Sequence, residues 1–169
     1  MSKKCWIAFV FTVIAGTLIS PVRCRAEVQC PWLNAATAAG VLGGDVQATA
    51  TALTSQGDTT CDFKRNQHSA VFELTIAVHT MALPSKDFAT YLARCPGTVV
   101  PLKAIGNEAV QCVASSNSLN GGEQIIGRVR DRVFVIDIKR GSPRPSVSTQ
   151  NGLSDEARNV AEQVAGALF

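Results

Sequence analysis

The sequence predicts an α+β domain in which helices pack on an antiparallel sheet. Residues 69–80 alternate apolar and polar side chains, which is typical of a strand with one buried face. Similar short runs come in groups joined by turn residues, and segments with helical spacing of apolar residues separate the groups. Strands joined by short turns run antiparallel. The predicted order is therefore helix, three strands, helix, three strands, helix.

The first helix is expected over residues 35–42. Asn34 is a good N-cap, and Gly43 with Gly44 predicts the end of the helix. The same glycines could belong to a phosphate-binding loop, but such a loop needs the order strand, glycines, helix. Here the order is helix, glycines, strand, and the lysine of a P-loop is missing. We interpret the glycines as a helix cap.

Three strands are predicted to follow, over residues 46–53, 59–64 and 69–80. Residues 55–58 form a predicted turn between the first two, and residues 66–68 are a plausible hairpin link between the second and the third.

A second helix should start at Ser85, carry Asp87 in its first turn and end before Pro96. Three more strands are expected over residues 109–114, 123–130 and 132–139. A tight hairpin is expected at Arg130 and Asp131, and a polar turn over residues 117–122.

The last helix is expected to be capped by Ser154, after an exposed, Pro- and Ser-rich connection over residues 141–149. Its predicted buried stripe consists of Leu153, Ala157, Val160, Ala161, Val164 and Leu168. The alternation of helices and strands hints at two similar halves, but no residue-level repeat demonstrates a duplication.

Residues 1–26 resemble an export signal. Lys3 and Lys4 precede an uncharged apolar run over residues 6–19, and Cys24-Arg25-Ala26 has small residues at both positions that a signal peptidase reads. We expect cleavage between Ala26 and Glu27. A membrane anchor is the alternative, but the run is shorter than the ~20 residues that a spanning helix needs.

Cleavage would leave residues 27–169 as a single domain with 12 basic and 13 acidic residues. The basic character of the full chain therefore resides in the signal, and bulk charge does not support a nucleic-acid partner.

The mature chain would keep four cysteines, Cys30, Cys61, Cys95 and Cys112. An even number in an exported chain favours disulfides, and no pair has the spacing of a zinc site. Three pairings are possible. We prefer Cys30–Cys61 with Cys95–Cys112, because each pair would tie a helix end to a nearby strand.

Cys30, Leu33 and the run Leu42-Gly43-Gly44, followed by Cys61 in a strand, resemble the opening of small bacterial secreted and lipoprotein domains. Residues 105–109, Ile-Gly-Asn-Glu-Ala, are also similar to a Leu-Gly-Asp-Glu-Ala turn in the second half of such domains. The resemblance covers most of residues 30–168 and implies an α+β fold, but it carries over no catalytic residue. This chain departs from the pattern by lacking a lipid-attachment box and by carrying Cys95 and Cys112.

Little else in the sequence indicates chemistry. His68 and His79 are the only histidines, with Glu73 as a conceivable third metal ligand, and we expect no metal site and no cofactor. No nucleophile motif occurs. Paired carboxylates for glycoside cleavage would have to come from Glu73, Glu108 and Glu123.

Arg128, Arg130 and Arg132 alternate along one predicted hairpin and could form a basic patch for an anionic partner. The alternative is a solvated outer face that blocks edge pairing.

The sequence thus favours a periplasmic or secreted, disulfide-stabilised binding or accessory protein without catalysis. The sequence does not identify its partner, for which another envelope protein and a small apolar ligand are the two candidates. A carrier of a small apolar ligand and an envelope hydrolase are the alternatives.

Overall fold

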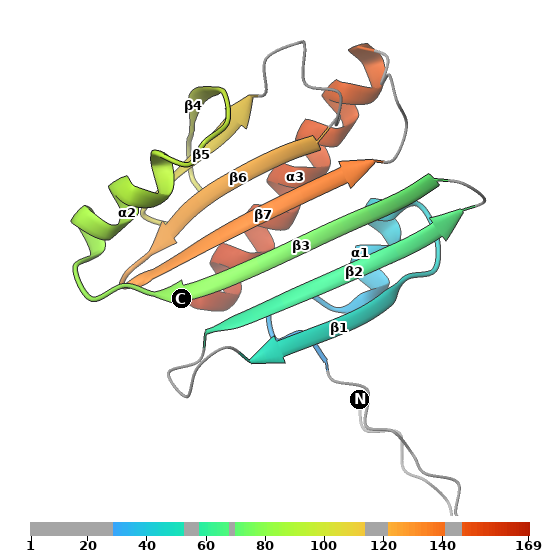
Figure 1. Cartoon of the computed structure of the whole chain (residues 1–169), viewed down its shortest axis with the longest axis horizontal. Helices are drawn as coiled ribbons and strands as arrows, with labels where there is room; N and C mark the ends of the chain where they lie inside the picture. Colours follow the sequence, from blue (N-terminus) through green and yellow to red (C-terminus); the bar gives the residue numbers. More distant parts are fainter. Residues whose placement is uncertain (1–28, 53–57, 68–69, 114–121, 141–146) are drawn as a thin grey trace, which may run out of the picture.

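The computed structural model describes residues 29–52, 58–67, 70–113, 122–140 and 147–169. Their seven strands form one antiparallel sheet in the order β1-β2-β3-β7-β6-β5-β4 (Figure 1). The elements in chain order are α1 (Ala35–Leu42), β1 (Gln47–Ala52), β2 (Thr59–Gln67), β3 (Ala70–Thr80), α2 (Pro84–Leu92), β4 (Thr98–Leu102), β5 (Glu108–Val113), β6 (Gly122–Val129), β7 (Arg132–Arg140) and α3 (Val147–Leu168).

The antiparallel sheet with packed helices confirms the predicted α+β class, but the predicted element order is wrong. Four strands, not three, lie between α2 and α3, because β4 was not expected. This strand sits at the edge of the sheet and contains Pro101, which cannot donate a ladder hydrogen bond. Only Leu102 of its five residues is even partly buried, so the strand has no apolar alternation to reveal it.

The last helix also differs from the prediction. It begins at Val147 rather than after Ser154, so residues 147–149 are helical and not part of a connection. Ser154 lies inside the helix, where its hydroxyl accepts a hydrogen bond of 2.7 Å from the Gln111 side chain. The predicted stripe is correct: its residues are buried from Leu153 to Val164, and Leu168 packs partly buried at its end.

The sheet has two unequal faces. On one face α1 and α3 cover the main core, which contains Phe63, Leu74, Ile76, Phe134 and Ile136, all with no exposed surface. On the opposite face α2 covers a smaller cluster near the ends of β5, β6 and β7. That cluster consists of Met81, Phe88, Val110, Cys112, Ile126 and Val133. Figure 1 shows α1 and α3 behind the sheet and α2 at the end of β6.

Both predicted ends of α1 are confirmed. The Asn34 side chain accepts a hydrogen bond of 2.8 Å from the Thr37 backbone N–H, and Gly43 adopts the left-handed conformation with φ of 75°. A third contact was not predicted: the Arg65 guanidinium on β2 donates to the Leu42 carbonyl at 2.6 Å. A cation at a helix C-terminus also interacts favourably with the helix dipole.

The two disulfides are Cys30–Cys61 and Cys95–Cys112, the pairing preferred from the sequence. The first links the segment before α1 to β2 on the main-core face. The second links the end of α2 to β5 on the opposite face. No helix in the described part of the chain is both long enough and apolar enough to span a bilayer.

Candidate functional site

The fold organises a polar surface on the part of the sheet that α2 leaves uncovered. We call it the open face. It consists of side chains of β1, β2, β3, β7 and β6 that point away from α1 and α3: Thr49, Asp62, Lys64, Glu73, Thr75, Ala77, Gln124, Asp137 and Lys139. It is the sheet surface formed by β2, β3 and β7 that faces the viewer in Figure 1.

A row of polar residues crosses the middle of the open face at right angles to the strands. Cross-strand register places Thr49, Asp62, Thr75, Asp137 and Gln124 side by side on five successive strands. The Thr75 hydroxyl donates to Asp62 Oδ1 at 2.9 Å, and Gln124 Nε2 donates to Asp137 Oδ1 at 2.9 Å. These two bonds order four of the five side chains before a partner binds. Binding then costs less side-chain conformational entropy.

Asp137 has the most unusual electrostatic environment in this row. Burial raises the pKa of its carboxyl above the ordinary 3.8, because desolvation disfavours the charged form. The hydrogen bond from Gln124 and the charge of Lys139 act in the opposite direction, and the charge of Glu73 acts in the same direction as burial. The Oε1 atom of Gln124 is buried and has no hydrogen-bond partner.

A second row on the open face is charged. Lys64, Glu73 and Lys139 are neighbours on β2, β3 and β7, and Lys64 Nζ lies 2.9 Å from Glu73 Oε1. The hydrogen bond and the charge of Glu73 raise the pKa of the Lys64 ammonium. Both signs of charge therefore alternate across this part of the surface.

His79 lies at the α2 end of the same sheet face. Its Nδ1 is 3.6 Å from Asp58 Oδ2, and its ring stacks on Tyr91 of α2 with a centroid distance of 6.0 Å. Asp58 Oδ1 also accepts a hydrogen bond from the Thr80 backbone N–H at 2.8 Å. Burial raises the pKa of the Tyr91 hydroxyl. These contacts join α2 to the ends of β2 and β3.

The structure separates the acids and histidines considered from the sequence. Glu73 and His79 share a face of β3 but stand six residues apart, which is ~20 Å along a strand. Glu123 lies on the α3 side, where its carboxylate accepts a bond from Gln111 at 2.8 Å, and Glu108 pairs with Arg128. His68 lies outside the described residues. No three His, Cys, Asp or Glu side chains gather as metal ligands within the ranges given above.

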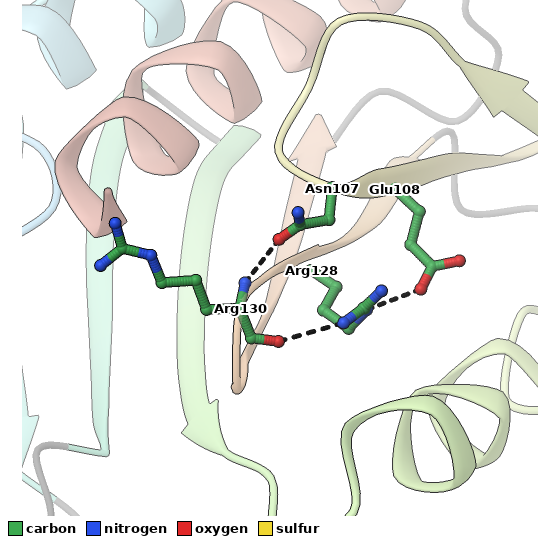
Figure 2. Close-up of polar contacts among 4 residues, drawn as sticks. All are labelled: Asn107, Glu108, Arg128 and Arg130. Atoms are coloured by element: carbon green, nitrogen blue, oxygen red, sulfur yellow. Dashed lines mark hydrogen bonds and ion pairs between the residues drawn. The ribbon is translucent and has the colours of Figure 1, made fainter.

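Arg128 belongs to a structural cluster at the turn between β6 and β7 (Figure 2). Its guanidinium donates to Glu108 Oε1 at 2.6 Å and to the Arg130 carbonyl at 3.1 Å. The Asn107 side-chain carbonyl accepts from the Arg130 backbone N–H at 2.6 Å, and the Asn107 backbone N–H donates to the Arg128 carbonyl. Gly106 before it has φ of 59°. The Ile-Gly-Asn-Glu-Ala turn thus braces the predicted hairpin at Arg130 and Asp131, which is confirmed.

The three arginines of the candidate basic patch have different surroundings. Arg128 is paired with Glu108 on the α2 side of the sheet, and Arg132 lies on the other side with its guanidinium 5.8 Å from the Trp32 ring. The Arg130 side chain extends away from the cluster in Figure 2, toward the C-terminal Phe169, whose ring is 5.9 Å away.

Two hollows surround the segment that precedes α1. One has a volume of about 130 Å³ and is lined by Gln29, Cys30, Leu33, Asn34, Ala35, Ala48 and Phe63. The other is a shallow depression of about 420 Å³ beside Trp32 and Gln163. Pockets for small ligands usually enclose ~300–1,000 Å³. The first hollow is too small, and the second too open, to hold the ligand of a carrier.

Sequence reasoning did not find the open face as a site. Alternation in each strand identifies polar residues such as Thr75 and Asp137, but only the register between strands brings them into one row. Comparison with protein-family models, with curated proteins and with solved structures finds no match to this chain.

Proposed function

We propose that this chain is an exported, non-catalytic binding protein of the bacterial envelope and that the open face is its binding surface. The observation that supports this proposal is the row across the open face, in which two hydrogen-bonded pairs, Asp62–Thr75 and Asp137–Gln124, lie side by side. A face of this kind offers fixed donors and acceptors to a partner over a broad area. The two disulfides are compatible with an oxidising compartment, and the export signal expected over residues 1–26 agrees with it.

The chemistry of the open face favours another protein as the partner. Its side chains are polar or charged, with both signs interspersed, and they form hydrogen bonds in pairs. Charged groups across protein interfaces are arranged so that opposite signs meet, and this face offers both signs to a partner. Glu73 and His79 lie far apart on β3, and Glu108 and Glu123 are paired with other side chains, so the acids and histidines considered from the sequence form no common cluster. His79 instead lies 3.6 Å from Asp58 and stacks on Tyr91, in contacts that join α2 to the sheet.

Site-specific crosslinking in the host cell tests the proposal. A photoreactive amino acid replaces Thr75 at the centre of the open face, and the same group replaces exposed Asn159 on α3 as the matched control. We expect one discrete crosslinked protein from position 75 and none from position 159. Glu73→Lys should abolish that crosslink, because it puts three lysines in a row with Lys64 and Lys139.

Equal crosslinking from both positions, or a crosslink that is insensitive to Glu73→Lys, would contradict the assignment of the open face. Export is tested separately by the intact mass of the protein from the envelope fraction. We expect the mass of residues 27–169 less about four hydrogens, which corresponds to signal cleavage and two disulfides.

A further inference from the structure

The two outer strands of the sheet differ in how they are protected against pairing. β4 has five residues and contains Pro101, a common device that prevents an edge from adding another strand. β1 is the opposite edge, and its sequence Gln-Ala-Thr-Ala-Thr-Ala contains no proline and no charge. In the described part of the chain, the outer edge of β1 has no pairing strand.

A pocket with a mainly apolar lining, to which Gln29 and Asn34 add polar groups, lies beside this edge. It is the hollow of about 130 Å³, and Ala48 of β1 and Phe63 of β2, which face each other in the ladder, both line it. Leu33 and Ala35 line it from the segment that leads into α1. The short Ala48 side chain leaves this space open beside the strand. A cavity of ~150 Å³ holds a benzene molecule, so the pocket suits one medium-sized apolar side chain.

We propose that β1 is the docking edge for an extended segment of a partner protein, which pairs with β1 as an added strand and places one apolar side chain in the pocket beside Ala48. Directly opposed residues of paired strands have Cβ atoms ~4.5–5.5 Å apart and project to the same face. A residue opposite Ala48 therefore projects toward α1, where the pocket lies. Backbone bonds to β1 supply affinity, and the pocket supplies selectivity.

The pocket also argues against a second copy of this chain as the occupant. If the β1 strands of two copies paired antiparallel, their α1 sides would lie on the same face of the joined sheet. On that face, each alanine of β1 would stand opposite an alanine of the other copy. An alanine methyl group cannot fill a pocket of this volume. Six paired residues would also bury much less than the ~1,200 Å² of a stable dimer. This proposal stands independently of the function assigned to the open face.

The probes are blocked hexapeptides of sequence acetyl-Thr-Ala-Thr-X-Thr-Ala-amide, in which X is Leu, Ile, Val, Met, Phe or Ala. Fluorescence anisotropy of labelled peptides with the full mature protein measures the affinity. We expect binding by at least one peptide with a large apolar X and at least tenfold weaker binding when X is Ala. Absence of binding by all five large-X peptides at millimolar concentration overturns the proposal.

Backbone methylation distinguishes strand pairing from simple occupation of the pocket. Alternate N–H groups of a strand point to opposite edges. N-methylation of the three Thr residues blocks one edge, and N-methylation of the other three residues blocks the second. We expect one methylated peptide to lose binding and the other to keep it. If both still bind, no strand is added and the proposal is wrong.

A pair of variants locates the site on the protein. Ala48→Leu fills the pocket with the protein's own side chain and should abolish peptide binding. Ala89→Leu is the matched control, at an exposed alanine of α2 on the opposite face of the sheet and outside the pocket, and should leave binding unchanged. If the two variants change peptide binding equally, the pocket beside Ala48 is not the binding site. The proposal is also overturned if the protein alone sediments as a dimer that the peptide dissociates, because the occupant is then a second copy.

Discussion

Gly127 on β6 faces Phe134 on β7, and the ring lies where a Cβ of residue 127 would be. A methyl group at position 127 would stand 2.1 Å from the ring Cζ and 2.7 Å from both Cε atoms. Ordinary van der Waals contact begins at 3.4 Å, so the ring would have to move by about 1.3 Å. Phe134 has no exposed surface and lies in the main core, where close packing leaves no space for that movement.

Gly127→Ala should therefore destabilise the protein. Overpacking of this kind costs about 1–3 kcal/mol, and the large displacement puts the expected cost at about 2 kcal/mol. Urea unfolding with the disulfides intact measures the change in the free energy of unfolding. The same substitution should cost nothing, or stabilise by up to about 1 kcal/mol, in a Phe134→Leu background. Leucine lacks the three ring atoms that clash, and alanine restricts the unfolded chain.

A double-mutant cycle of positions 127 and 134 tests whether the clash with the Phe134 ring causes the destabilisation. A coupling energy of at least about 2 kcal/mol between positions 127 and 134 is expected, because the clash exists only when both side chains are present. If the effects of Gly127→Ala and Phe134→Leu add within about 0.5 kcal/mol, the ring does not occupy the space above Gly127 and the reasoning is refuted.

Three further predictions concern other parts of the fold. Gly106→Ala should cost at least about 2 kcal/mol in urea unfolding, because φ is 59° and the new Cβ would lie 2.5 Å from the Arg128 carbonyl oxygen; a neutral substitution would contradict this geometry. Burial raises the folded-state pKa of Asp137, so its ionisation destabilises the folded state as pH rises through that pKa. Asp137→Asn should then match the parent protein below pH 3.8 and be more stable at pH 7, whereas parallel pH profiles would argue against a buried carboxyl. Replacing both Cys30 and Cys61 by alanine should lower the free energy of unfolding by about 3.7 kcal/mol, the chain-entropy estimate for a loop of 31 residues. The same replacement of Cys95 and Cys112, which close a loop of 17 residues, should lower it by about 3.1 kcal/mol. The reverse ranking would show that loop length does not dominate the stabilisation by these disulfides.

Local patterns predicted much of this fold. Alternation located β3 to within one residue, and cap residues located both ends of α1. The cysteine pairing also followed from placing each helix end beside a strand. The strand and the helix ends depend on residues that are close in sequence. The disulfide pairing was one of only three possibilities for four cysteines.

The features that were missed depend on tertiary context. β4 carries no apolar alternation, because it pairs on one side only and its five residues are largely exposed. The start of α3 was misplaced because Ser154, a typical cap residue, instead bonds to Gln111 on β5. The row from Asp62 to Gln124 follows from strand register across the β3–β7 junction, which no local pattern specifies.

The β3–β7 pairing has a consequence for the order in which the sheet is completed. β3 ends at Thr80, while its neighbour β7 ends only at Arg140, so a chain that emerges N-terminus first exposes one edge of β3 during the synthesis of 60 further residues. That edge belongs to the most apolar strand of the first half, with Leu74, Ile76 and Val78 on one face. Pairing between such distant segments closes slowly, because a long loop must be ordered first. We therefore expect pairing of β3 with β7 to be a late step of folding, and a delay in the final third of the chain to leave the edge of β3 exposed to aggregation.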